Sequence, residues 1–174
     1  MHFSFIWGRN KMGDTARPET ARAVVDEARR WLGTPYRHQA SCPGVGVDCL
    51  GLVRGVYQSL FPDTPPPPVP AYRPYGEIGE AELLWQAAST YLVVQPMPRL
   101  LDADGYAAGD IVLFRMRPRL PARHLAILTD ATHMLHAQSH VGVCEVAFTA
   151  WWRRHAVARF TMPPLGAASS GKTT

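Results

Sequence analysis

The feature that most constrains the fold of this chain is a change in hydrophobic period between its two halves. In the first half, apolar residues recur at intervals of three and four positions, which is typical of helices with one buried face. In the second half, short runs of branched residues are separated by turn-like positions, which is typical of antiparallel strands. Helices followed by a strand meander predict an α+β domain, with the helices packed on one antiparallel sheet.

Three helices are expected in the first half. The first covers residues 18–33 and has a proline near its first turn and a glycine just after its end. The second begins at Cys49 behind Asp48, which is a favourable N-cap, and a proline at position 62 stops it. A third is expected over residues 79–91, after the Pro-rich stretch 62–74, which is interpreted as an extended connector.

The second half predicts consecutive antiparallel strands over residues 109–116, 124–129, 133–138 and 143–148, with 155–162 adding one more. A chain of 174 residues is about one domain long. We expect that domain to cover residues 15–164, with a flexible arm over 1–14, or upstream sequence if Met12 is the true start. The small, polar residues 165–174 predict a disordered tail.

Charge and hydropathy exclude some classes of protein. The net charge is +4, and the basic residues are scattered apart from residues 115–119 and 151–154, which favours anionic partners only weakly, so no nucleic-acid partner is expected. No stretch approaches the roughly 18 apolar residues of a membrane span, so no integral membrane association is expected. The apolar residues 3–7 are fewer than a secretory signal needs. We therefore expect synthesis in the cytoplasm without a signal peptide.

Cys49 is the first candidate for chemistry, because it stands where a helix begins. The positive end of a helix dipole and its unpaired N–H groups stabilise thiolate over thiol, which makes Cys49 a candidate nucleophile. The alternative is a small buried residue that seals the helix against the sheet. Gly51 and Gly55, four positions apart in the same helix, predict close approach of another backbone to that face.

A nucleophilic cysteine needs a base, and His124 and His136 are the informative histidines. A hairpin with an odd loop centred on Asp130 would place them opposite each other on one face of the sheet. His124 could then be the base, with His136 fixing its tautomer. The alternative is a pair of histidines at strand ends without a catalytic role.

The other two cysteines and two further histidines are weaker candidates. Three cysteines without regular spacing do not form a disulfide framework, which favours a reducing compartment. His133, His136, His140 and Cys144 have spacings that suit a metal site on a helix face, but their neighbours indicate strands. No metal site is expected, Cys42 and Cys144 are interpreted as passive, and His133 and His140 as solvated.

Five motifs in order resemble one known family. They are "LGTPYRH", "GVDCLGLV", "AAGDIVLF", "HLAILTD" and "MLHAQ", and the similarity runs from about Ala21 to Phe160. Together they resemble the NlpC/P60 cysteine peptidases, which have a papain-like fold and hydrolyse peptidoglycan stem peptides. "PYRHQAS" and "DCLGLVRGVY" look more like the branch of phage cell-wall peptidases found with phage tails and gene transfer agents.

The resemblance implies roles for five residues. Cys49 would be the nucleophile, His124 the base and His136 the third polar residue. Tyr36 matches a family tyrosine that helps to bind the substrate or the oxyanion, with a core aromatic as the alternative. Asp48 matches a residue that contacts a substrate amine, although capping the helix is a competing or additional role. "RHQASCPG" departs from the family pattern and leaves the substrate contacts of residues 38–43 open.

The function implied by the resemblance is acyl transfer through a thioester, without a metal or organic cofactor. The bond would join the D-glutamate side chain to the diamino acid of the stem peptide. A wall hydrolase made in the cytoplasm needs delivery, so the resemblance predicts incorporation in a phage-like tail, delivery to the periplasm of a target cell, and tail hub or baseplate proteins as partners. "AWWRRH" is one candidate contact for them, or else a sheet-packing pair. The alternatives are a structural tail component that retains the fold, and an amidase or acyltransferase.

Overall fold

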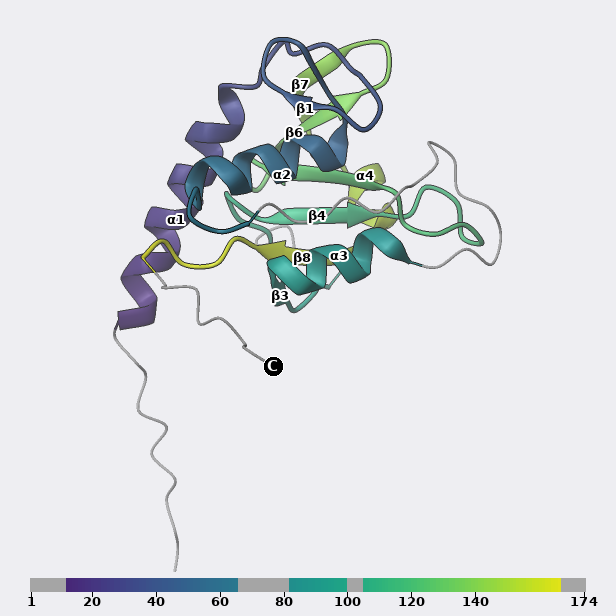
Figure 1. Cartoon of the computed structure of the whole chain (residues 1–174). Coiled ribbons are helices and arrows are strands. Elements are labelled where there is room, and N and C mark those ends of the chain that lie inside the picture. Colours follow the sequence, from purple (N-terminus) through teal and green to yellow (C-terminus); the bar gives the residue numbers. More distant parts are fainter. Residues whose placement is uncertain (1–11, 66–81, 100–104, 167–174) are drawn as a thin grey trace, which may run out of the picture.

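A computed structural model describes residues 12–65, 82–99 and 105–166 (Figure 1). The helices are α1 (Met12–Arg29), α2 (Cys49–Leu60), α3 (Leu83–Tyr91) and α4 (Ala150–His155). The strands are β1 (Ser41–Cys42), β2 (Gly46–Val47), β3 (Val93–Gln95), β4 (Ile111–Phe114), β5 (His124–Leu128), β6 (His133–Gln138), β7 (Gly142–Ala147) and β8 (Ala156–Thr161). Among these helices, none is long and apolar enough to cross a membrane. The α+β class predicted from the sequence is confirmed.

The first helix corrects the sequence prediction at both ends, since it ends at Arg29 and does not continue to Leu32. The first helix begins at Met12, so Pro18 lies inside it and not near its first turn. A proline costs a helix one backbone hydrogen bond but does not forbid it. α2 begins at Cys49 and ends at Leu60, as predicted. α3 ends at Tyr91, while residues 79–81 of its predicted start and most of the Pro-rich connector lie outside the described residues.

Six strands form one antiparallel sheet in the order β3-β8-β4-β5-β6-β7. The strands from β4 to β7 follow one another as the predicted meander. The last strand does not continue it: β8 returns to pair with β4, and β3 pairs with the far side of β8. β8 and β3 extend the sheet beyond β4, whereas β5 and β6 are interior strands because each lies between two strands of the meander. Residues on β5 and β6 are therefore packed from both faces of the sheet.

The two faces of the sheet carry separate apolar cores. Leu125, Ile127 and Leu135 face the helices α1, α2 and α3, where they pack with residues such as Leu52. Residues of the opposite parity on the same strands, such as Ala126 and Met134, pack with Phe148 and Trp152. Figure 1 shows α2 and α3 in front of the sheet and α4 behind it. One face of the sheet is therefore covered by α1, α2 and α3, and the other face is covered by α4 and the segment before it.

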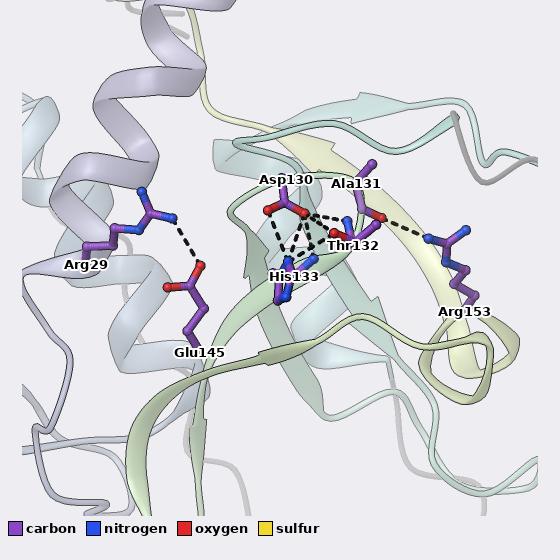
Figure 2. A network of polar contacts seen from close by, with 7 residues as sticks. All are labelled: Arg29, Asp130, Ala131, Thr132, His133, Glu145 and Arg153. Carbon is purple, nitrogen blue, oxygen red and sulfur yellow. Dashed lines mark hydrogen bonds and ion pairs between the residues drawn. The ribbon is translucent and has the colours of Figure 1, made fainter.

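The turn between β5 and β6 is held by Asp130. Its carboxylate Oδ1 accepts hydrogen bonds from the backbone N–H groups of Thr132, at 2.6 Å, and His133, at 2.8 Å, as Figure 2 shows. A hydrogen bond from the hydroxyl of Thr132, at 2.7 Å, and these backbone bonds hold the pKa of Asp130 at about 2, below its ordinary value. Arg153 donates a hydrogen bond to the carbonyl of Ala131 in the same turn, which joins α4 to the hairpin.

Candidate active site

Cys49 is the first residue of α2. Asp48 precedes it in extended conformation and accepts a hydrogen bond at Oδ1 from the N–H of Gly51, at 2.8 Å, which confirms the predicted N-cap. A Cβ at Gly51 would lie 1.9 Å from the carbonyl oxygen of Ala40, and one at Gly55 would overlap the ring of Trp31. The predicted close approach of a backbone to the glycine face is confirmed at Gly51, whereas a side chain fills the space at Gly55.

The thiol of Cys49 meets the start of β5. Its Sγ lies 3.7 Å from the carbonyl oxygen of Arg123, the residue directly before His124. Burial, and after it the negative charge of Asp48, raises the pKa of Cys49 to about 12. Backbone hydrogen bonds, including those at the helix start, oppose this rise but do not offset it. The expectation that the helix dipole holds a thiolate is therefore wrong for this structure, because desolvation outweighs it.

His124 and His136 lie in direct contact on one face of the sheet. Their imidazoles are joined by a hydrogen bond between Nε2 of His124 and Nδ1 of His136, with the two nitrogens 2.8 Å apart. The pairing of Ile127 with Leu135 centres the hairpin on Ala131, not on Asp130. The predicted shared face is confirmed, but the two histidines are diagonal neighbours, because moving the centre of the hairpin by one residue displaces each pairing by two.

Burial keeps this histidine pair neutral. Desolvation, together with the charge of His136, lowers the pKa of His124 to about 3. Desolvation alone lowers the pKa of His136 to about 4. At neutral pH one of the two facing nitrogens therefore carries the proton and the other accepts it. The second nitrogen of His136, Nε2, is buried and has no hydrogen-bond partner among the described residues.

Aromatic rings enclose His124. Trp152 stacks on its imidazole, with ring centroids 5.7 Å apart and planes at 27°. Phe114 lies 5.9 Å away on β4. The sequence pattern of "AWWRRH" predicts a partner contact or a sheet-packing pair and does not indicate that Trp152 belongs to this site. The two tryptophans are adjacent and their rings lie 5.0 Å apart, so local sequence does not distinguish the one that covers His124.

Asp48 and Tyr36 lie beside the helix start. The second carboxylate oxygen of Asp48, Oδ2, accepts a hydrogen bond from the N–H of Gln39, at 2.6 Å, and lies 3.5 Å from Nδ1 of His38. The "RHQASCPG" segment thus folds onto Asp48, which is only 2% exposed. Tyr36 pairs with Val47 in an isolated bridge and packs partly buried against the helical-face core. Substrate contacts for these two residues stay predictions.

The weaker candidates are dispersed. Cys42 is exposed on β1. Cys144 lies opposite His136 on β7, with its thiol 3.9 Å from the side-chain oxygen of Gln138. His133 contacts Asp130 in the turn, and His140 is exposed. Within the residues that the structure describes, no group of three or more His, Cys, Asp or Glu side chains is arranged to hold a metal ion.

Helices packed on a six-stranded antiparallel sheet, with Cys49 at the start of a helix and its thiol against the backbone before His124, are consistent with a papain-like α+β domain. The sequence profile of the NlpC/P60 family matches residues 33–160, which is most of the chain. The chain belongs to the NlpC/P60 family. Among curated proteins, none matches it.

Solved structures of low sequence identity share the fold. The NlpC/p60 domain of the peptidoglycan hydrolase SagA is 22% identical with a TM-score of 0.54, over 82% of this chain and 98% of that one. A Staphylococcus aureus protein described as similar to lipoprotein, of the NLP/P60 family, is 20% identical with a TM-score of 0.53, over 83% and 41%. A Bacillus cereus NlpC/P60 family protein is 18% identical with a TM-score of 0.55, over 83% and 40%. The chain thus spans less than half of the last two proteins.

Proposed function

We propose that this protein is a cysteine peptidase that cleaves the stem peptides of peptidoglycan. The observation that supports this most directly is the meeting of two elements: the thiol of Cys49 at the start of α2 lies against the backbone directly before His124, and His124 is hydrogen-bonded to His136. A nucleophile, a base and an orienting group are the three parts that acyl transfer by a thiol requires.

The tautomer of the histidine pair fixes the direction of proton transfer. If His136 accepts at Nδ1, His124 carries its proton on Nε2 and its Nδ1 is a base for the thiol proton of Cys49. The opposite tautomer would protonate Nδ1 of His124 and block this step. The productive tautomer leaves the proton of His136 on the buried Nε2. Trp152 lies edge-to-face with that ring, at 5.3 Å.

The reaction then proceeds in two halves. His124 takes the thiol proton as Cys49 attacks the peptide carbonyl, and returns it to the leaving amine, which gives a thioester and a free amine. Water, activated by the same histidine, releases the carboxylate and restores the thiol. The N–H of Gly51 already donates to Asp48, so the oxyanion is assigned to the N–H groups of Cys49 and Leu50 at the helix start.

The particular bond and the route of delivery are part of the proposal. The bond between the D-glutamate side chain and the diamino acid follows from the family resemblance, and the SagA domain, which shares the fold, is named a peptidoglycan hydrolase. The proposal of incorporation in a phage-like tail, with hub or baseplate partners, rests on the amino-acid sequences of the motifs around Tyr36 and Cys49. A tail particle would carry the enzyme to the periplasm of a target cell.

Digestion of purified peptidoglycan tests the activity. The wild type, Cys49→Ala and Cys42→Ala are incubated with it, and mass spectrometry identifies the released fragments. We expect the wild type and Cys42→Ala to release the same peptides and Cys49→Ala to release none, because Cys42 is exposed on β1 and takes no part in the site. Equal release by all three proteins would contradict the assignment of Cys49.

The fragment masses also separate the alternatives. Cleavage at the glycan–peptide amide would indicate an amidase, and transfer of an acyl group to an added amine without net hydrolysis would indicate an acyltransferase. Silence of all three proteins, together with copurification of the chain with tail proteins, would favour a structural tail component.

A further inference from the structure

We propose that Trp152 is a positioning residue for His124: its indole lies over the imidazole and fixes the ring plane in which Nε2 stays bonded to His136 and Nδ1 is left as the proposed base. The inference rests on the proposed function, because it assigns Trp152 a part in the same site. The stacking geometry supports the inference. The ring centroids of Trp152 and His124 lie 5.7 Å apart with their planes at 27°, which is within the range of offset aromatic stacking.

The contacts of Trp152 extend over the whole histidine pair. It lies edge-to-face with His136 at 5.3 Å and with Phe114 at 5.1 Å. His124 and His136 themselves cross at 83°, with their centroids 5.0 Å apart. Rotation of either imidazole about its side-chain bond would break the bond between them, and the indole occupies the space into which His124 would turn. Trp152 therefore restricts the one torsion on which the productive geometry depends.

The helix that carries Trp152 is held on three sides. Arg153 donates to the carbonyl of Ala131 in the β5–β6 turn, at 2.8 Å (Figure 2). Its guanidinium also lies 5.2 Å from the ring centre of Phe148 and 5.9 Å from that of Tyr106. At the other end of α4, the carbonyl of His155 accepts from the N–H of Arg115, directly after β4. A helix of six residues has little stability alone, so these contacts set the position of the indole.

The charged and titratable groups on the elements around His124 are few. They are Arg123 before it, Cys49 and Asp48 on the α2 side, His136 on β6, Arg153, Arg154 and His155 on α4, and Arg115 after β4. Arg115 is paired with Glu82, and Arg153 is directed at the turn. Of all these groups, His136 is the one whose charge lowers the pKa of His124, after burial itself. Uncovering the imidazole is therefore expected to raise that pKa.

Titration of His124 by NMR tests this without any need for turnover. Isotope-labelled histidine is followed with pH in the wild type, Trp152→Leu, Trp152→Phe and Trp151→Leu, and His124→Gln assigns the signal. Trp151 is the control because it neighbours Trp152 on α4, meets its ring at 5.0 Å and is itself 47% exposed. It tests whether the loss of packing beside Trp152, without loss of its indole, moves the pKa. We expect Trp152→Leu to raise the pKa of His124 by at least about one unit, Trp152→Phe to raise it by less, and Trp151→Leu to leave it unchanged.

A pKa of His124 that stays at the wild-type value in Trp152→Leu, or that moves equally in Trp151→Leu, overturns the proposal. If the leucine variant does not fold, Trp152→Phe decides in the same way, since its smaller ring leaves part of the imidazole uncovered. Because this measurement needs no substrate, it stands even if the wild type fails to cleave peptidoglycan. Failure of the proposed function and failure of this inference are thus separate results.

Kinetics give a second readout once a cleaved substrate is in hand. We expect Trp152→Leu to lower kcat by about tenfold to a hundredfold, because the base leaves its productive plane, while KM is unchanged. The acidic limb of the pH profile should move to higher pH, and Trp152→Phe should restore part of kcat. A lower melting temperature with kcat and the acidic limb at their wild-type values would mean that Trp152 only fills space, and would overturn the proposal.

Discussion

Burial decides the resting charges of the site at the scale of single residues. A thiol with a pKa near 12 and an imidazole with a pKa near 3 are both neutral at pH 7. A neutral thiol with a neutral imidazole holds the same number of protons as a thiolate with an imidazolium, so attack needs only an internal proton transfer. The sequence pattern around Cys49 and Asp48 indicated the helix start correctly but not the desolvation, which depends on how β5 covers it.

The pH dependence of cleavage follows from these two pKa values. His124 is a base only when it is neutral, which holds at any pH above its lowered pKa, and Cys49 keeps its proton up to its raised pKa. We expect kcat/KM to be flat from about pH 5 to about pH 9. The measurement is the pH profile of kcat/KM on a soluble stem peptide. An acidic limb near pH 6.5, the ordinary value for histidine, would contradict this expectation.

The charge of Asp48 can be tested separately from its cap. In Asp48→Asn the side-chain oxygen can still accept from the N–H of Gly51, but the negative charge that raises the pKa of Cys49 is gone, together with the oxygen that accepts from the N–H of Gln39. We expect that pKa to fall, measured as the pH dependence of thiol alkylation with Cys42 and Cys144 changed to alanine. Asp26→Asn, on the exposed side of α1, is the control and should leave the alkylation profile unchanged.

At the scale of elements, α2 packs closely on its neighbours because its two glycines have no side chains. The backbone of Ala40 lies where a Cβ at Gly51 would be, so the strand-turn segment before Asp48 packs directly on the helix. Spacing of the glycines was enough to predict this approach. The spacing was not enough to predict which residues approach the helix, because those residues lie on a segment whose path only the tertiary structure decides.

Gly51→Ala tests this packing. An alanine in a helix normally stabilises it relative to glycine, but here the new methyl group would lie 1.9 Å from the carbonyl oxygen of Ala40. We expect the free energy of unfolding to fall by about 1–3 kcal/mol, measured by chemical denaturation. Ser59→Ala, on the exposed side of the same helix, should change it little. An equal or higher stability for Gly51→Ala would mean that the two backbones are not in contact.

At the scale of the whole molecule, the site exists because two distant parts of the chain meet. Cys49 is carried by a helix on one face of the sheet, and Trp152 belongs to the core of the other face. His124 stands at the first position of β5, where both faces end. β5 and β6 are interior strands of the sheet, and Trp152 on α4 covers both imidazoles of the histidine pair.

The free energy of unfolding at acidic pH should depend on the burial of the histidine pair. The folded pKa values of His124 and His136 are about 3 and about 4, below the ordinary 6.5 of the unfolded chain. As pH falls below about 6.5, the unfolded state binds protons that the folded state does not, so the free energy of unfolding decreases toward pH 3. Denaturant titrations measure this decrease in the free energy of unfolding for the wild type and for a double variant, His124→Gln with His136→Gln.

The double variant should lose most of the decrease in stability between pH 6.5 and pH 4. His140→Asn is the control, because His140 is exposed and has a left-handed backbone, with φ of 67°, which asparagine tolerates. If the double variant keeps the wild-type slope, the acid sensitivity comes from other groups and the histidine pair is not the buried, neutral pair described above.

The sequence by itself determined the α+β class, the extent of α2 with its cap at Asp48 and the positions of β4 to β7, and it predicted a shared face for His124 and His136 on the condition of an odd hairpin loop. These follow from local periods and capping preferences, which act over a few residues. Only the tertiary structure decided the return of β8 beside β4, the two-residue displacement of the hairpin register, the neutral thiol and the stacking of Trp152 on His124. Each of these depends on which surfaces bury one another, and burial is a property of contacts between residues far apart in the chain.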